Sequence, residues 1–431
     1  MRLVGVIALV LLGAACTASI APLPPARVPH PVRAEPAGGA GKRMDQTDQP
    51  VRVALATGRA NASVSATGEW RLYDRTGEHQ LARGAPGETW TITRDGAMLR
   101  ARSDRGAVTV QFRGPLVARP TAPGSLVRYE GRAYRGELLV IALGGSLTVV
   151  NRLSVEEYLR GVVPLEIGVD RTPFERAAVE AQAIAARSYT YTRIDDSKPY
   201  DLSSTVTDQV YGGVAAERPV SDAAITATRN LVLLYHGRVI NAPYHANSGG
   251  MTASASEVWR TRDAPYLVSV SDRIPGTDRF YDEASPVFRW TRTFGTAALQ
   301  AALDRYLPRY AGAPRDGVGG VRAITVTGRT PSGRVAGVRF DTDRGSFTVR
   351  GNDVRFVLRT AAGALLPSTL FHIRVTRDAR GRVALLAIDG NGSGHGVGMD
   401  QWGAIARARA GQDYVTILRT YYPGTTVGPI G

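Results

Sequence analysis

The sequence predicts an α+β protein with a strand-rich body, one long helix and short C-terminal helices. Between positions 51 and 150, short alternating apolar stretches are separated by glycine-rich breaks, which is typical of half-buried strands. Helical periodicity follows, and strand-like stretches return between 230 and 390. Because strands and helices do not alternate regularly, the α+β class is favoured over a parallel βαβ fold.

Each predicted element rests on a local pattern. The clearest strands of the first part are 51–55, 138–143 and 147–150. Thr172-Pro173-Phe174-Glu175 has the spacing of a capping box with proline at the first helical position, so a helix is expected from Pro173 to Ile194. Its apolar face is mostly alanine, which allows close packing, and comprises Phe174, Ala177, Ala178, Ala181, Ile184, Ala185 and Ser188.

The second half of the chain is predicted to hold further strands and three shorter helices. The strands are expected at 231–235, 321–326, 335–340, 347–349 and 371–375. The helices are expected at 297–306, 401–410 and 414–421, and the last one stops at Pro423-Gly424. We find no internal repeat.

Composition narrows the class of partner. Hydrophobic residues make up 43% and charged residues 21% of the chain, so a core can be buried. The formal charge is +15 and comes almost entirely from arginine, which suits an anionic surface such as a cell wall or lipid headgroups. Nucleic acid is disfavoured because no basic cluster is interleaved with aromatic residues. The other interpretation is a solvated, arginine-rich surface.

The N-terminus predicts export. Arg2, the apolar run Leu3–Leu12 and the small residues before Cys16 form the three regions of a signal peptide, and the run is too short to span a bilayer. A cysteine directly after small residues is typical of a bacterial lipobox, although Gly13 stands where a large aliphatic residue is usual. Cys16 is therefore predicted to be lipidated, and ordinary cleavage nearby is the alternative.

The next segment, residues 17–50, is rich in proline, alanine and glycine and is predicted to be a tether. Cys16 is the only cysteine of the chain. Internal disulfides, a cysteine-based zinc site and a cysteine nucleophile in the folded region are therefore excluded.

Glu166 is the first candidate for chemistry. It lies between Leu165 and Ile167, after Pro164, in what the sequence suggests is a loop before the capped helix. A carboxylate beside apolar neighbours has a raised pKa and serves as a general acid at neutral pH. A surface glutamate on a loop is the structural alternative.

The capped helix itself carries polar groups among small residues. Gln182, Arg187 and Tyr189 are candidates to bind a sugar or to orient Glu166. The structural alternatives are that Arg187 pairs with a carboxylate and that Tyr189 belongs to the core.

Two further segments combine histidine with glycine. His245 and Ser248 precede Gly249-Gly250, but no nucleophile elbow supports a hydrolase triad, and a turn is the alternative. His395 lies among four glycines that let the backbone turn tightly around it, and Asp400 is expected to cap the helix that follows. Metal-ligand spacings such as His-Glu-x-x-His are missing from the sequence, and no metal or cofactor is predicted.

Taken together, these segments resemble the stage II sporulation protein D family, whose members include peptidoglycan lytic transglycosylases and amidase enhancers. The resemblance covers about residues 50–427 and rests on motifs in a fixed order. These are 157–166, 181–189, 208–213, 244–250 with 257–259, 265–267, 368–371, and 394–403 through 421–424. It implies that 51–150 is the N-terminal strand-rich part and 151–427 the catalytic part.

The resemblance implies that Glu166 cleaves the bond between N-acetylmuramic acid and N-acetylglucosamine and leaves 1,6-anhydro ends. One carboxyl group then acts first as acid and later as base, whereas hydrolytic glycosidases usually need two. The residues expected to bind the glycan are Gln182, Arg187, Ser188, Tyr189, Gln209, Tyr211, His245, Ser248, His395 and Gln401.

The chain departs from the family at two places. Some members bind zinc through a cysteine near the histidine of the motif at 244–250, and here Ser248 replaces it, so no metal is predicted. Asp400 stands where serine is common, and Trp402 also differs.

The implied partners are glycan strands of peptidoglycan, outside the cytoplasm, and a membrane through the anchor on Cys16. The alternative function is a non-catalytic glycan-binding protein that activates a cell-wall amidase.

Overall fold

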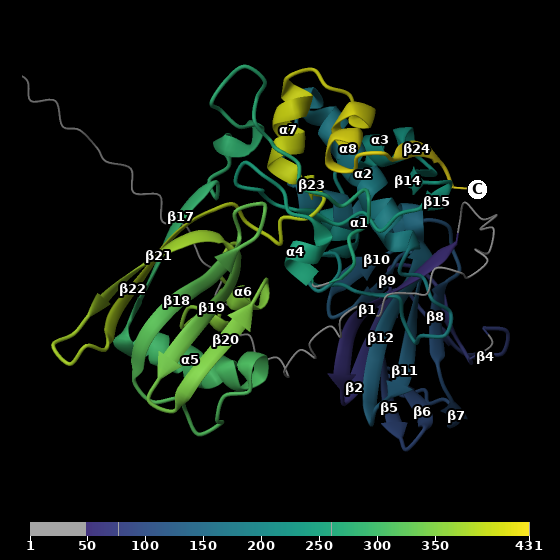
Figure 1. The fold of residues 1–431 in the computed structure, drawn as a ribbon. Helices are drawn as coiled ribbons and strands as arrows, with labels where there is room; N and C mark the ends of the chain where they lie inside the picture. Colours follow the sequence, from purple (N-terminus) through teal and green to yellow (C-terminus); the bar gives the residue numbers. More distant parts are fainter. Residues whose placement is uncertain (1–48, 76, 260, 431) are drawn as a thin grey trace, which may run out of the picture.

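The computed structural model describes residues 49–75, 77–259 and 261–430, and two large hydrophobic cores organise them (Figure 1). One core joins the N-terminal strands to a layer of helices. The other lies inside a separate lobe, which the chain forms between the motifs at 244–250 and 394–403. Eight α-helices and many strands in the described part confirm the predicted α+β class.

The N-terminal strands form two packed sheets, which are antiparallel except where β13 pairs in parallel with β1. The alternation expected from the sequence is visible in β2, where every second residue is buried. The sheet orders are β13-β1-β12-β11-β8-β3-β4 and β10-β9-β2-β5-β6-β7. The strands are β1 Pro50–Arg59, β2 Asn61–Ala66, β3 Trp70–Tyr73, β4 Gln80–Gly84, β5 Trp90–Asp95, β6 Met98–Ser103, β7 Phe112–Arg113, β8 Leu116–Pro120, β9 Val127–Tyr129, β10 Arg132–Tyr134, β11 Glu137–Leu143, β12 Ser146–Ser154 and β13 Leu202–Ser203.

A layer of helices covers one end of these sheets and shares their core (Figure 1). Helix α2 lies at its centre and contacts α1, α3, α7 and α8. Its alanine-rich face is buried, so the neighbouring helices approach closely. The α-helices are α1 Val155–Ile167, α2 Arg176–Tyr191, α3 Pro219–Ala227, α4 Ala255–Trp259, α7 Gln401–Arg409 and α8 Tyr414–Tyr421. The short 3-10 helices are η1 Pro173–Glu175, η2 Gly213–Ala216 and η3 Tyr281–Ala284.

Two small sheets tie distant parts of the helical layer together. In the first, β14 pairs with β15 and with the last strand, β24. In the second, β16 pairs in parallel with β23, which places His245 opposite Asp400. The strands are β14 Leu231–Tyr235, β15 Arg238–Val239, β16 Tyr244–His245, β23 Met399–Asp400 and β24 Thr426–Pro429. We call the N-terminal sheets and the helical layer the body.

Residues 289–391 form the separate lobe, which we call the inserted domain. It has two three-stranded sheets, β17-β22-β21 and β18-β19-β20, packed with α5 around its own core. This lobe lies inside the range 151–427, which was expected from the sequence to be one catalytic part. The elements are β17 Arg289–Gly295, α5 Thr296–Ala311, β18 Val321–Arg329, β19 Val335–Thr342, β20 Gly345–Arg350, α6 Asp353–Val357, β21 Leu370–Arg377 and β22 Val383–Asn391.

The expected elements are largely present, with two corrections. Helix α1 was not predicted, and Glu166 lies in its last turn and not in a loop. Phe174, expected on the buried helix face, belongs to η1 and is 86% exposed. Cys16 and nearly all of the predicted tether lie outside the described residues. Within the described part, no helix is both long and apolar enough to cross a membrane.

Candidate active site

Helix α1 ends near the surface of the body, and Glu166 lies in its last turn. The helix begins at a capping serine, Ser154, whose hydroxyl accepts a hydrogen bond from the Glu157 amide. Pro164 lies one turn from the C-terminal end, and the helix stops three residues later. Glu166 is therefore a helix-end residue, half-buried, with Leu165 exposed beside it and Ile167 buried.

The surroundings of Glu166 favour its neutral form. Burial raises the pKa of the Glu166 carboxyl above its usual value. Two hydrogen-bond donors partly oppose this shift: the Val210 amide, 2.9 Å from Oε1, and the side chain of Gln401. The carboxyl is thus held in place by donors and still biased toward protonation, which is the state that a general acid requires.

Gln401 links Glu166 to the long helix. Gln401 is the first residue of α7, directly after the Asp400 cap, and its Nε2 donates to Oε1 of Gln182 at 3.2 Å. Gln182 is fully buried, and its own Nε2 has no hydrogen-bond partner. The structure therefore brings Gln182 and Gln401 together beside Glu166.

Gln209 forms hydrogen bonds with three hydroxyl groups near Glu166. Its Oε1 accepts from Tyr158 and Thr190 at 3.2 and 3.0 Å, and its Nε2 donates to the Tyr244 hydroxyl at 2.9 Å. Burial, with a further contribution from the Glu166 charge, raises the pKa of the Tyr244 phenol well above its usual value, so Tyr244 is neutral. Gln209 thus fixes the loop whose next residue, Val210, binds Glu166.

Tyr189 contacts the same loop, at residue Asp208. Its hydroxyl donates to Oδ1 of Asp208 at 3.4 Å, and the Arg193 guanidinium lies over its ring at 4.6 Å. Burial raises the pKa of Tyr189 to about 12. Tyr189 therefore supports the 208–210 loop as a neutral hydrogen-bond donor.

Three of the predicted glycan-binding residues make internal contacts. Arg187 is fully buried and pairs through two nitrogens with Glu156, at 2.7 and 2.9 Å, which is the structural alternative considered for it. The Ser188 hydroxyl donates to the Ile184 carbonyl and accepts from the Leu233 amide. The buried Tyr211 hydroxyl donates to Oδ1 of Asn151. Each links elements that carry the site.

The buried His245 and the half-buried His395 form a second cluster. Their rings lie 5.5 Å apart, and Trp259 packs on His395 at 5.1 Å. Burial lowers the pKa of His395 to about 3, and burial together with the neighbouring His395 lowers that of His245 well below its usual value. Both rings are neutral at physiological pH. His245 Nε2 has no hydrogen-bond partner.

Arg334 reaches this cluster from the inserted domain. It is buried, and its Nη2 donates to the Ser248 carbonyl at 3.0 Å while Nε and Nη1 have no partner. Burial lowers its pKa to about 10. Gly396 gives it room, because a Cβ built on Gly396 would lie 2.6 Å from the Arg334 Cζ. Sequence analysis missed this residue, since nothing in its local pattern distinguishes it from the surface arginines.

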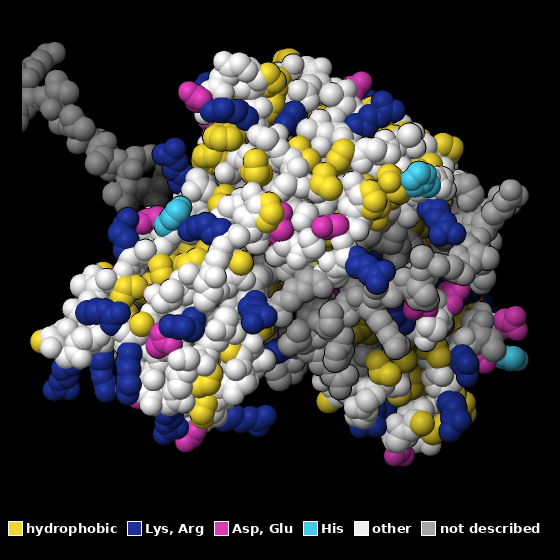
Figure 2. Space-filling view, viewed as in Figure 1, with side chains coloured by type: hydrophobic (Ala, Val, Ile, Leu, Met, Phe, Trp, Pro, Cys, Tyr) yellow, Lys and Arg dark blue, Asp and Glu magenta, His cyan; other side chains and the backbone are white. Residues whose placement is uncertain are grey.

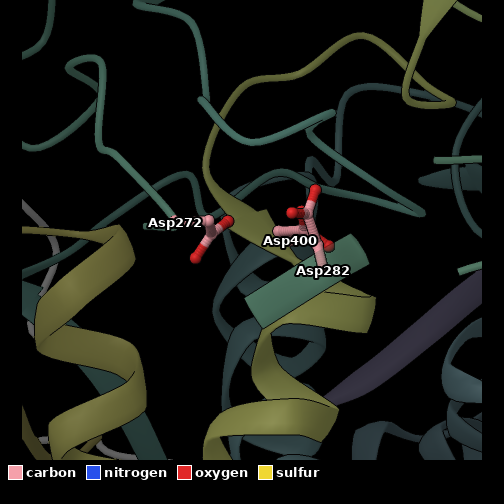
Figure 3. Close-up of side chains that lie close together, drawn as sticks. All are labelled: Asp272, Asp282 and Asp400. Atoms are coloured by element: carbon pink, nitrogen blue, oxygen red, sulfur yellow. The ribbon is translucent and has the colours of Figure 1, made fainter. Parts of the chain in front are cut away.

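Three buried aspartates converge beside Ser248 (Figure 3). Asp282 Oδ2 accepts from the Ser248 hydroxyl and from the Gly249 and Gly250 amides, at 2.9 to 3.0 Å. Asp400 accepts from the Ser248 amide and caps α7 through the Gly403 amide, as predicted. The third member, Asp272, accepts from Arg407 and Tyr421. Their hydrogen bonds therefore connect the loop at Ser248 to helix α7.

Carboxylate oxygens of these three aspartates lie within 4.8 Å of one another, a spacing that a metal ion would also accept. Most of the oxygens already accept hydrogen bonds, and Asp282 Oδ1 is the one without a partner. Burial and the neighbouring carboxylates raise the pKa of Asp400 well above its usual value. Protonation of Asp400 therefore lowers the repulsion among the three carboxylates. Asp272 and Asp282 carry no sequence signal that would have revealed them.

Comparison with known proteins divides the chain along the same lines. Residues 144–235, which contain Glu166 and Gln182, match the family model described as stage II sporulation protein. Residues 274–398, which contain the inserted domain, match a model described only as a domain of unknown function.

Three curated relatives share 29% identity with this chain. An uncharacterised protein of Brachyspira hyodysenteriae matches over 88% of this chain and 92% of its own length. The Bacillus subtilis protein named amidase enhancer matches over 62% of this chain and 40% of its own length, so the chain spans less than half of that relative. Stage II sporulation protein D of the same organism matches over 64% of this chain and 75% of its own length.

Proposed function

Because the chain carries a domain of the stage II sporulation protein family, we propose that it acts on the bacterial cell wall, outside the cytoplasm, as a peptidoglycan lytic transglycosylase. Glu166 is the catalytic residue of this proposal. The observation that carries it is the helix-end carboxyl of Glu166, held by the Val210 amide and biased toward protonation by burial.

The reaction needs one carboxyl group in two protonation states. Protonated Glu166 donates its proton to the glycosidic oxygen as the bond to the muramic anomeric carbon breaks. The resulting carboxylate then takes the proton of the muramic 6-hydroxyl as that oxygen attacks the same carbon. The carboxyl ends the cycle protonated, no water is consumed, and the product carries a 1,6-anhydro ring.

The surroundings of Glu166 suit a sugar polymer. Four exposed apolar side chains lie on the segments next to Glu166 and on the loop that leads to Val210: Leu165, Val169, Phe174 and Val206. Apolar sugar faces pack on such surfaces, and amide groups such as that of Gln401 bind sugar hydroxyls. We assign Phe174 and Gln401 to substrate binding.

Glu166→Gln tests the proposal on purified glycan strands. We expect the release of 1,6-anhydro products to fall at least ~100-fold, because general acid–base catalysis contributes about this much or more. Glu180→Gln is the matched control, since Glu180 lies on α2 and pairs with Arg176. Mass spectrometry after digestion in isotopically labelled water separates the outcomes: label in the new reducing end means hydrolysis and contradicts the proposal.

The pH profile tests the role of Gln401. Since the acid must be protonated, turnover should fall as the pH rises through the raised pKa of Glu166. Gln401 stabilises the charged form, so Gln401→Ala should raise that pKa further and move the decline to higher pH. An unchanged profile with a raised KM would make Gln401 a substrate contact only.

The second candidate is a glycan-binding protein that enhances a cell-wall amidase, which the match to the amidase enhancer supports. It predicts no glycan cleavage by the wild-type protein and an increase in amidase turnover that survives Glu166→Gln.

Cys16→Ser tests the proposed anchor, because it should move the exported protein from the membrane fraction to the soluble fraction.

A further inference from the structure

Most of the net positive charge of the chain is concentrated in the inserted domain. Residues 289–391 contain seventeen arginines, seven aspartates, and neither lysine nor glutamate, a formal charge of +10 against +15 for the whole chain. Thirteen of these arginines are exposed. In Figure 2 the dark-blue side chains gather over the lobe formed by β17–β22, with few magenta ones among them.

One end of the domain collects six of these arginines. The strand directions place the turn 378–382, the turn 342–345 and the loop 312–320 together at the end opposite Arg334. We call this the distal end. Its arginines are Arg315, Arg322, Arg344, Arg377, Arg380 and Arg382.

Ion pairs and a hydrogen bond join these loops into one surface. Asp343 pairs with both Arg322 and Arg382, at 2.8 and 3.0 Å, and Arg344 pairs with Asp316 at 2.6 Å. Arg377 donates to the Arg322 carbonyl. The six arginines share the distal end with three aspartates, so a net positive charge remains there.

The shape and composition of the distal end restrict its partner. Turns at the ends of strands are convex, which suits a flat surface better than a polymer that needs a groove. No Phe, Tyr or Trp of residues 289–391 is exposed, so bases would find no stacking platform. Guanidinium groups bind phosphate oxygens through paired hydrogen bonds.

We propose that the distal end of the inserted domain docks on an anionic phospholipid surface. Each arginine near such a surface contributes about 1 kcal/mol, roughly a fivefold gain in binding. Docking at the distal end holds the body, at the opposite end of the domain, away from the lipid. The proposal does not depend on the chemistry of Glu166, since vesicle binding is measured without glycan.

The test compares two triple variants of equal net charge. Arg344→Gln, Arg380→Gln and Arg382→Gln remove charge from the distal end, and Arg83→Gln, Arg100→Gln and Arg102→Gln remove it from exposed positions of the N-terminal sheets. Both sets are made in the full chain with Cys16→Ser, so that a lipid anchor does not contribute. Binding is measured by co-sedimentation with phosphatidylcholine vesicles, with and without phosphatidylglycerol, at about 0.1 M salt.

We expect the parent protein to bind only the vesicles that contain phosphatidylglycerol, and to lose binding when salt is raised. The distal triple should bind on the order of 100-fold more weakly, while the sheet triple stays within about threefold of the parent. Equal losses in both triples, or equal binding to neutral vesicles, would overturn the proposal. Tighter binding to soluble polyphosphate than to vesicles of equal phosphate content would also overturn it, in favour of a polymer. Circular dichroism confirms that both triples are folded.

Discussion

In the body, key arginines are buried against carboxylates, whereas in the inserted domain most arginines point into solvent. Arg187 with Glu156 and Arg407 with Asp272 join helices of the body to their neighbours. In the inserted domain, Arg374 pairs with Asp389 on an exposed strand face. The same residue type thus fixes the structure in one region and creates an electrostatic field in the other, which composition alone does not distinguish.

The largest expected effect comes from breaking a buried pair of the body. Arg187→Leu leaves the Glu156 carboxylate buried without its partner, and should lower the free energy of unfolding by about 3–5 kcal/mol in urea titrations. Arg374→Leu, at a side chain that is 73% exposed, should cost less than about 0.5 kcal/mol. The double variant Arg187→Leu with Glu156→Leu should regain most of the loss. Equal costs at the two arginines would contradict the comparison.

A smaller effect is expected where the two regions meet. Gly396→Ala introduces a Cβ 2.6 Å from the Arg334 Cζ and strains a residue at φ +87°, so we expect a loss of about 2–3 kcal/mol. Gly381→Ala in the β21–β22 turn has a similar φ, +73°, and open space, and should cost only about 1 kcal/mol. Thermal unfolding of both variants measures the difference, which is the contribution of the Arg334 contact.

The smallest effect concerns the aspartate cluster. A carboxyl whose pKa is higher in the folded state binds more protons there, so stability falls as the pH rises from the unfolded pKa toward the folded one. Asp400 is such a group, and the Asp282 charge is among the causes. Asp282→Asn should therefore flatten the decline of Tm that begins above about pH 4, the usual pKa of an unfolded aspartate, and should gain up to ~1 kcal/mol at neutral pH.

Two results would contradict that expectation. A large loss of stability in Asp282→Asn at high pH would show that the charge of Asp282 is needed. If a chelator lowered the stability of the wild-type protein as much as Asp282→Asn does, the three aspartates would be a cation-binding site.

The sequence predicted those features that depend on local pattern. The α+β class, helix α2 with its capping box, and most strands of the inserted domain follow from periodicity and turn residues. Helix α1 was missed because Pro164 argues against a helix, although Ser154 and Glu157 have the spacing of a capping box. Phe174 fits the helical period but precedes α2, where the chain is still a 3-10 turn.

The features that were missed depend on contacts between distant residues. Asp272, Asp282 and Arg334 have no motif, and only the folded chain brings them to Ser248. The motifs found Gln182, Gln401 and Gln209 without giving their partners. Arg187, Ser188 and Tyr211 stand in the same motifs, yet their contacts are internal, because a motif preserves residues that support a site as well as those that reach a substrate.

The pairing of Gln182 with Gln401 joins residues 219 positions apart, with the whole inserted domain between them. During synthesis Glu166 leaves the ribosome before α7, so its contact with Gln401 forms only after the C-terminal part of the chain has been made. The surroundings of Glu166 are thus completed by a helix near the end of the chain. The environment of the Glu166 carboxyl therefore depends on a C-terminal helix as well as on its own helix α1.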